Sequence, residues 1–322
     1  KYDRDPTDLD EVESTRTAYD GDDILNGNAG SDLMIGGGSV LMDILNGGSG
    51  DDVIIGDMGV ITGKADIDQT GTNNSVLAIE LDAVRSTSQS VGGVDRISHG
   101  SGDDVVIGGV GADVISAGII APTVVATETD ILAANAGETG RDIIAGDGAQ
   151  MTFRATEGNG THVLNLIYSY QPTIGDSDLI GAGAGGDIVL GGVGNDVILS
   201  GNGNSIGLGD AGRLVGAETG RITGDHALIT LTEAVSVSPT DGGDDTITLG
   251  RGIAVVIGGV GIDTITTDGP AGNQGTAVIL GDAGRIVTNT ETNSRDFHVL
   301  LVETLFPEVG AGDFITTTAG SD

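Results

Sequence analysis

The sequence predicts an all-β fold: a parallel β-solenoid from which β-hairpin inserts project. Three observations predict it: a nine-residue unit that recurs nearly unchanged, weaker copies that keep its period, and intervening segments in which polar and apolar residues alternate. The unit reads Gly-Gly-x-Gly-x-Asp-x-apolar-x, which is typical of a tight glycine-rich turn followed by a carboxylate and a short strand. Its clearest copies are Gly47–Ile55, Gly108–Ser116, Gly191–Leu199 and Gly258–Thr266.

Weaker copies of the unit lie around these and are placed by the period. Most of them keep the aspartate of the sixth place. The fuller copies keep Asp23, Asp32, Asp43, Asp104 and Asp187, and partial copies keep Asp95, Asp142, Asp178, Asp245 and Asp313. Two copies carry Ser205 and Ala254 in the sixth place instead, so we expect their turns to lack a complete site.

The units are grouped in blocks, and each block that is followed by a hairpin-type insert ends in Gly-Asp with another glycine close behind. These inserts alternate polar and apolar residues, as in Leu228–Thr232, which predicts a β-hairpin that leaves the solenoid and returns to it. Residues 117–139 lack this pattern and contain Pro122, so we expect a loop there. One elongated body is expected over residues 1–322, with blocks at about 18–57, 92–147, 175–210, 241–282 and 310–322 and inserts at about 58–91, 117–139, 148–174, 211–240 and 283–309.

The outward-facing residues of the strands predict a second apolar face. The eighth residue of the unit points into the core, so the seventh and ninth point out. The ninth residues alternate between polar and apolar from one unit to the next, as in Ser98, Ile107 and Ser116, and consecutive units belong to opposite sheets. One sheet therefore has an apolar outer face too large to leave exposed. We expect the inserts, or a neighbouring copy of the chain, to cover it.

The composition suits a narrow stack rather than a globular centre. Of 322 residues 58 are glycine and only 6 are proline, so the glycine serves turns and not a collagen-like or disordered segment. Apolar residues make up 38% of the chain and aromatic residues 2%, which favours thin layers of Val, Ile and Leu. The sequence has no cysteine, which fits a secreted bacterial-type protein that is stabilised by metal ions in place of disulfide bonds.

The charge of the chain points to cations as partners. Asp and Glu outnumber Lys and Arg 48 to 13, and the net charge of −35 argues against nucleic acid or an anionic membrane as a partner. No apolar run of about 18 residues is present, so we expect no membrane insertion. Two carboxylates about 5 Å apart repel by about 3 kcal/mol at an effective dielectric of about 20, so rows of them would outweigh a domain's net stability. Oxygen donors from aspartate and backbone carbonyls select Ca²⁺, and we expect folding to depend on several calcium ions.

The nonapeptides, GGSGDDVII among them, resemble the RTX (repeats-in-toxin, haemolysin-type) calcium-binding repeats. The resemblance covers the blocks but not the inserts, whose length is closer to giant extracellular surface proteins than to compact toxin tails. It implies a right-handed parallel β-roll in which each Ca²⁺ lies between neighbouring turns at one edge. Sixth-place aspartates and turn carbonyls would hold the ion there. Glycine suits such turns because they need φ > 0 and carbonyls directed at the ion.

Carried over by position, the implied metal ligands are sixth-place acids and turn glycines. The acids are Asp23, Asp32, Asp43, Asp52, Asp95, Asp104, Asp113, Asp142, Asp178, Asp187, Asp196, Asp245, Asp263 and Asp313. The glycines are Gly27, Gly30, Gly47, Gly50, Gly108, Gly111, Gly191, Gly194, Gly258 and Gly261. For the acids that end the blocks, turn capping is favoured over calcium ligation; these are Asp57, Asp147, Asp210 and Asp282.

No catalytic constellation is recognisable in the sequence. His162, His226 and His298 recur at one place in the inserts, but each is alone, so a structural or hairpin-edge role is favoured over a metal ladder. Two glycine-rich segments, 181–186 and 207–212, match GxGxxG, but neither opens a helix in a βαβ unit, so no dinucleotide site is expected. We therefore expect no enzyme.

These observations favour a non-catalytic, calcium-stabilised structural segment of a large extracellular surface protein, fibre or adhesin, exported by a type I-like route and rigidified by Ca²⁺ after secretion. Its expected partners are copies of itself or other surface proteins. One alternative is the C-terminal calcium-binding secretion module of a type I-exported protease, lipase or toxin. A minor alternative is an ice-binding solenoid, suggested by the Thr-Ile-Thr runs at residues 246–248 and 264–266. Because Leu9–Thr15 is similar to Leu81–Thr87, we expect the chain to be a window of a longer protein.

Overall fold

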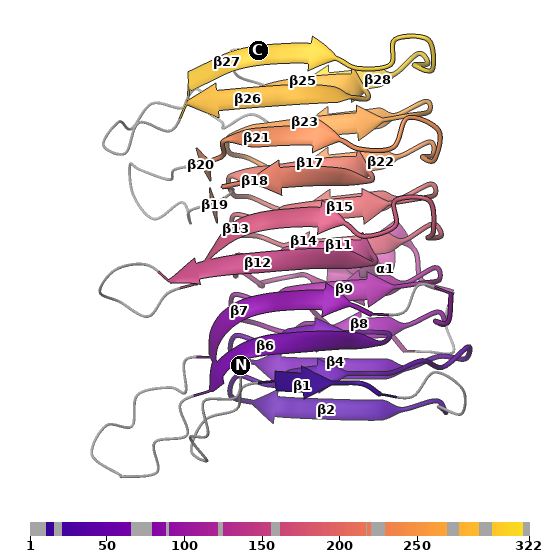
Figure 1. The fold of residues 1–322 in the computed structure, drawn as a ribbon, viewed down its shortest axis with the longest axis vertical. Helices are drawn as coiled ribbons and strands as arrows, with labels where there is room; N and C mark the ends of the chain where they lie inside the picture. The colour runs from indigo at the N-terminus through magenta and orange to yellow at the C-terminus, as the bar shows by residue number, and fades with distance from the viewer. Residues whose placement is uncertain are drawn as a thin grey trace.

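The computed structural model describes residues 11–15, 21–65, 79–87, 90–121, 125–155, 162–216, 218–219, 229–268, 277–289 and 298–317. Over these residues the chain is nearly all β, and most strands lie in two parallel sheets and one antiparallel sheet. The predicted all-β class is confirmed. Figure 1 shows the strands stacked along the long axis, with the chain advancing from one end of the stack to the other. In the part of the chain that is described, no helix is long and apolar enough to cross a membrane.

The short strands of the nine-residue units form the two parallel sheets, and successive strands alternate between them. Neighbours pair in register, so that Ile54 lies between Met34 and Val106 of the adjacent strands. One strand of each sheet with its turns is called a coil below. Sheet I contains β2 (Ile24–Ala29), β4 (Ile44–Ser49), β8 (Arg96–Ser98), β10 (Val114–Ser116), β14 (Leu179–Gly183), β16 (Val197–Ser200), β22 (Thr246–Leu249), β24 (Thr264–Thr267) and β28 (Phe314–Thr317). Sheet II contains β3 (Leu33–Ile35), β5 (Val53–Ile55), β9 (Val105–Gly109), β11 (Ile143–Asp147), β15 (Ile188–Gly192), β17 (Ser205–Asp210), β23 (Ala254–Gly259) and β25 (Ala277–Asp282).

The hairpin-type inserts form the antiparallel sheet, called sheet III. The expected hairpins are confirmed, because β6 pairs with β7, β12 with β13, β18 with β21 and β26 with β27. Sheet III contains β1 (Glu11–Glu13), β6 (Gly59–Ala65), β7 (Ile79–Ser86), β12 (Ala149–Ala155), β13 (His162–Ser169), β18 (Gly212–Val215), β21 (Glu233–Ser236), β26 (Gly284–Asn289) and β27 (His298–Thr304). Two more short strands, β19 (Glu218–Thr219) and β20 (Ile229–Thr230), pair with each other.

Two apolar layers separate the three sheets. Along β5, Ile54 belongs to the layer between sheets I and II, whereas Val53 and Ile55 belong to the layer between sheets II and III. Sheet II is thus buried on both faces, which explains its nearly continuous apolar strands. The predicted apolar outer face exists, and the inserts cover it, as Figure 1 shows for sheet III lying across the parallel strands.

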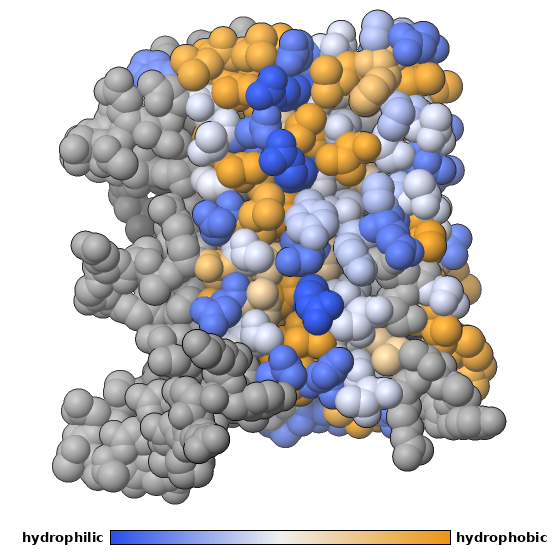
Figure 2. Space-filling view, in the orientation of Figure 1, coloured by the Kyte–Doolittle hydropathy of each residue, from blue (hydrophilic) through white to orange (hydrophobic). Residues whose placement is uncertain are grey.

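The outer face of sheet III is polar along its middle, where Figure 2 shows a column of hydrophilic residues. A chain of ion pairs crosses four strands of this sheet. Arg213 contacts Glu233, Arg285 Nε lies 2.6 Å from Glu233 Oε1, and Arg285 reaches Glu303 at 3.5 Å. Such surface pairs contribute little stability, so the sheet is held mainly by the apolar layer beneath it.

The expectation of a loop over residues 117–139 is wrong in part. Helix α1 (Glu128–Ala134) lies within this segment and packs against β14. Thr127 caps its first turn, where the Thr127 and Asp130 side chains bond each other's backbone N–H groups, and Ile131 is fully buried. This capping box is readable in the sequence, but the helix is too short to show an apolar periodicity.

Candidate metal-binding rows

The sixth-place acids lie in two rows at opposite ends of the coils. Each acid directly precedes a strand, and sheets I and II receive their strands from turns at opposite ends, so the acids of each sheet stack on one edge. Every predicted acid belongs to one of these rows. Row I, before sheet I, contains Asp23, Asp43, Asp95, Asp113, Asp178, Asp196, Asp245, Asp263 and Asp313. Row II, before sheet II, contains Asp32, Asp52, Asp104, Asp142 and Asp187.

Within each row the carboxylates connect one coil to the next. The backbone N–H of an acid donates to Oδ1 of the equivalent acid in the following coil, as from Asp95 to Asp113 at 2.8 Å and from Asp52 to Asp104 at 2.8 Å. The same bond recurs along the whole of row I at 2.7–3.1 Å. One oxygen of each such carboxylate is therefore committed to holding the stack.

The other oxygen, Oδ2, is buried without a hydrogen-bond partner in most of these acids. This is a costly arrangement, because a buried carboxylate oxygen that lacks a partner loses its hydration without compensation. It occurs at Asp32, Asp52, Asp95, Asp113, Asp142, Asp178, Asp196, Asp245 and Asp263. The repetition over both rows shows that the arrangement belongs to the repeated unit and is not a local irregularity.

The first-place glycines show where these free oxygens are directed. A Cβ atom at Gly108 would lie 2.5 Å from Asp113 Oδ2 and 2.2 Å from the carbonyl oxygen of Gly146 in the next coil. Gly191 and Gly258 have the same surroundings, each with an Oδ2 and a carbonyl oxygen of the following coil. Carboxylate and carbonyl oxygens thus converge beside each first-place glycine, and they are the donors that Ca²⁺ prefers. The residues present fit the calcium ions that the RTX resemblance implies.

The glycines of the unit serve two different purposes. Those of the fourth place have φ between 115° and 133°, as predicted for the turn; they are Gly30, Gly50, Gly111, Gly194 and Gly261. The first-place glycines do not have positive φ, so the expectation that all turn glycines need it is wrong for them. Their reason is the close approach of the two oxygens; they are Gly27, Gly47, Gly108, Gly191 and Gly258.

Burial makes several acids of the rows difficult to ionise without a cation. It is the largest cause that raises the pKa of Asp52 to about 7, of Asp196 to about 8 and of Asp245 to about 10. The charges of neighbouring acids add to burial at Asp113 and Asp178 and keep the pKa of each carboxyl well above its usual range. At neutral pH these positions need either protons or bound cations.

The block-ending acids cap turns, as the sequence favoured. Oδ2 of Asp57 accepts a hydrogen bond from the backbone N–H of Val110, and Oδ2 of Asp210 accepts one from Val260. Oδ1 of Asp210 accepts another from Gly243 at 3.0 Å, where the chain returns from sheet III. These acids therefore join the base of a hairpin to the short turn of the next coil.

Row II ends before row I does. Beyond Asp187 the described coils of sheet II carry Ser205 and Ala254 in the sixth place, as the sequence indicates, and Ala277 follows in β25. The backbone N–H of Asp187 lies 3.4 Å from Ser205 Oγ, and Asn204 Oδ1 accepts from the N–H of Ile253 at 2.9 Å. Hydroxyl and amide groups replace carboxylates on this stretch of the edge.

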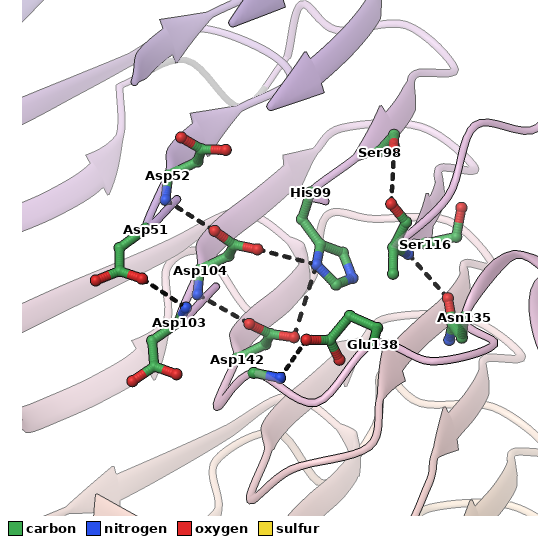
Figure 3. A network of polar contacts seen from close by, with 12 residues as sticks. Asp51, Asp52, Ser98, His99, Asp103, Asp104, Ser116, Asn135, Glu138 and Asp142 are labelled. Atoms are coloured by element: carbon green, nitrogen blue, oxygen red, sulfur yellow. Dashed lines mark hydrogen bonds and ion pairs between the residues drawn. The ribbon is translucent and has the colours of Figure 1, made fainter. Parts of the chain in front are cut away.

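One histidine that sequence reasoning missed lies inside row II. His99 occupies the first place of its unit, where the clearest copies have glycine, and that substitution is the signal that could have found it. Its imidazole is fully buried, with Nδ1 3.2 Å from Asp104 Oδ2 and Nε2 3.1 Å from the carbonyl oxygen of Gly181 (Figure 3). Burial opposes the charged imidazole, but Asp142 and Asp104 outweigh it and raise the pKa of His99 to about 9.

Of the histidines of the inserts, the described side chain of His298 lies outside this cluster. His298 is exposed on β27, opposite Asn289, and His162 begins β13; His226 lies outside the described residues. Among the residues described, the group of histidine and acidic side chains whose ligand atoms lie within 4.8 Å of one another is His99, Asp104 and Asp142.

Comparisons with models of known families, with curated proteins and with solved structures found no match.

Proposed function

We propose that this chain is a calcium-stabilised structural segment of a large extracellular surface protein, fibre or adhesin, folded as a right-handed parallel β-roll of the RTX kind. The observation that carries the proposal is the repetition, in two rows, of buried Oδ2 atoms without partners beside carbonyl oxygens of the next coil. Extracellular calcium modules have dissociation constants of about 10⁻⁴–10⁻³ M, so such a segment becomes rigid after export.

The residues that would hold calcium are the sixth-place acids, through Oδ2, and the carbonyls that face the first-place glycines. Bound calcium supplies the positive charge that allows neighbouring buried carboxylates to stay ionised. Because Oδ1 of each acid already accepts the N–H of the adjacent coil, an ion on Oδ2 adds a second connection between the same coils.

The way the acids are used supports a structural role in preference to catalysis. Along each row they are spread at no more than one per coil, and each is tied to the backbone of its neighbour. Ions bound in this way lie between coils, where they hold the length and straightness of the stack. Rigid spacing is what a fibre or an adhesin stalk requires.

The test is removal of calcium from the purified chain, followed by far-UV circular dichroism and small-angle X-ray scattering. With excess chelator at pH 7.5 we expect the β signal to fall and the radius of gyration to rise, and both to return when calcium is added back. Unchanged β content and shape after chelation would overturn the proposal.

A matched pair of variants locates the effect in the rows. Asp245 is buried and Asp244, its neighbour, is exposed. Asp245→Asn keeps an oxygen for the backbone N–H of Asp196 but removes the charge from Oδ2, so we expect at least one fewer bound calcium and a loss of about 1–3 kcal/mol in the calcium-saturated protein. Asp244→Asn should change stability by less than about 0.5 kcal/mol. Calorimetric calcium titration and urea unfolding measure both; equal behaviour of the two variants would count against ligation by row I.

A further inference from the structure

His99 takes the space that the first-place glycines leave open elsewhere. In the other turns of the unit this space lies between a carboxylate Oδ2 and a carbonyl oxygen of the next coil. At His99 the imidazole enters it from the backbone of the same turn, and Figure 3 shows the ring directed at Asp104 and Asp142. At one point of row II, the possible metal ligands between two neighbouring coils therefore include nitrogen as well as oxygen.

The hydrogen bond at Nε2 sets the tautomer of the ring. Nε2 lies 3.1 Å from the carbonyl oxygen of Gly181, which can only accept, so Nε2 carries a proton. In the neutral ring Nδ1 then presents its lone pair to Asp104 and Asp142. A histidine whose far nitrogen donates to a backbone carbonyl is the arrangement found around metal-bound imidazoles.

The distances from Nδ1 to the two carboxylate oxygens match a small coordination shell, and the three ligand atoms all lie within 4.8 Å of one another. Nδ1 lies 3.2 Å from Asp104 Oδ2 and 3.6 Å from Asp142 Oδ2. Donors about 2.0–2.1 Å from a tetrahedral Zn²⁺ lie about 3.3–3.4 Å from one another. The cluster therefore needs only small shifts to surround an ion of that size.

Two carboxylate oxygens at this point have no hydrogen-bond partner. Asp142 Oδ2 and Glu138 Oε2 make no hydrogen bond, and their residues are 0% and 6% exposed. Glu138 comes from the segment after α1, where its other oxygen accepts the N–H of Gly140, and Figure 3 shows its carboxylate turned toward Asp142 and the imidazole. A buried imidazole thus faces three carboxylates, two of which have an oxygen available for a cation.

We propose that His99, Asp104 and Asp142 form a site for one divalent transition-metal ion of the zinc class, with Glu138 beside it, at one point of row II in place of a calcium ion. Nitrogen donors favour Zn²⁺ and its neighbours over Ca²⁺, which takes six to eight oxygens in a wider shell. The imidazole also occupies the place where a calcium ion would lie between these coils. The ion would connect the coil that carries α1 and Asp142 to the preceding coil, which carries His99 and Asp104.

The test uses the whole chain refolded in millimolar calcium with one equivalent of Zn²⁺ or Co²⁺, because the site is buried and must be filled during folding. We expect one ion per chain after dialysis, and for Co²⁺ the intense visible absorption of a four-coordinate site. His99→Gln should lower the affinity for Zn²⁺ by more than about 100-fold, and Glu138→Gln by about 10–100-fold.

His298→Gln is the matched control, because His298 is exposed and outside the cluster, and its zinc binding should equal that of the unchanged chain. His99→Gly restores the glycine of the unit; it should lose the zinc site and gain a calcium, and it remains informative if the glutamine variant fails to fold. The proposal is overturned if the unchanged chain retains no Zn²⁺ or Co²⁺, which would leave His99 as a metal-free imidazolium. It is also overturned if excess Ca²⁺ displaces the ion or if His99→Gln binds zinc equally well.

Discussion

At the scale of single residues, the sixth-place aspartate divides its two oxygens between two tasks. Oδ1 accepts the backbone N–H of the preceding coil, and Oδ2 lies beside a first-place glycine and a carbonyl oxygen. The glycine matters as much as the acid, because any side chain there would enter the space between the two oxygens. At Gly191 the obstacle is backbone, the carbonyl oxygen of Gly209, which cannot move aside as a flexible side chain would.

Replacing a first-place glycine tests this directly. Gly191→Ala would place Cβ 2.2 Å from the carbonyl oxygen of Gly209, so we expect a loss of about 1–3 kcal/mol in calcium and one fewer bound ion. Gly207→Ala is the control, because its Cβ would lie 3.5 Å or more from its neighbours, and it should cost less than about 1 kcal/mol. Urea unfolding and calcium titration of both variants provide the measurement. Equal losses would show that the close approach of the two oxygens is not the reason for glycine at this position.

Residue patterns explain why some of the site could be predicted and some could not. The period of nine places Asp113 and its equivalents without ambiguity, because a repeated acid before a strand must stack on an edge of a parallel sheet. The place of His99 in the site was not predicted because it is a single histidine at a position where the unit has glycine. Its partner Asp142 follows only after the segment that contains α1. Glu138 was not predicted either, because it lies in an insert and does not belong to the repeated pattern of acids.

At the scale of elements, sheet II decides the architecture because it has two apolar faces. The alternation of polar and apolar ninth residues, with Ile107 apolar between Ser98 and Ser116, predicted the second face. The alternation within the inserts predicted the hairpins that cover it. The pairing of hairpins from successive inserts into one sheet could not be predicted, because it depends on contacts between segments far apart in the chain, such as β13 with β18.

The layer between sheets II and III should contribute stability independently of metal. Ile107 is fully buried in that layer, so Ile107→Ala should cost about 2–5 kcal/mol in saturating calcium without changing the number of ions bound. Ile119→Ala serves as the control, because Ile119 is 68% exposed and should change stability by less than about 0.5 kcal/mol. A fall in calcium number for Ile107→Ala would mean that the hairpin sheet is coupled to the rows.

At the scale of the whole molecule, the net charge of −35 and the burial of the rows together set the response to pH. Burial raises the pKa of Asp52 to about 7 and of Asp245 to about 10 from an ordinary value of 3.8. A carboxyl whose pKa is raised by folding holds its proton more tightly in the folded state. Its contribution to stability is complete below pH 3.8 and is lost as the pH rises toward the folded value.

In chelator we therefore expect the free energy of unfolding to fall as the pH rises from about 4 to 8, the reverse of ordinary acid denaturation. Calcium should remove most of this dependence at neutral pH, because the ions take the place of the protons. Urea unfolding at a series of pH values, with and without calcium, is the measurement. A metal-free chain that gains stability between pH 4 and 8 would contradict the assignment of the rows as cation sites.

The unequal length of the two rows gives the molecule a direction. Row I continues to Asp313, whereas row II has no acid in the described coils beyond Asp187. Under the proposed function, calcium depletion would remove ions from both edges of the first coils. In the later coils it would remove ions from the edge of row I only. The later coils would then separate from one another along the edge of row I only. The later part of the stack would therefore bend toward one side before it unfolded.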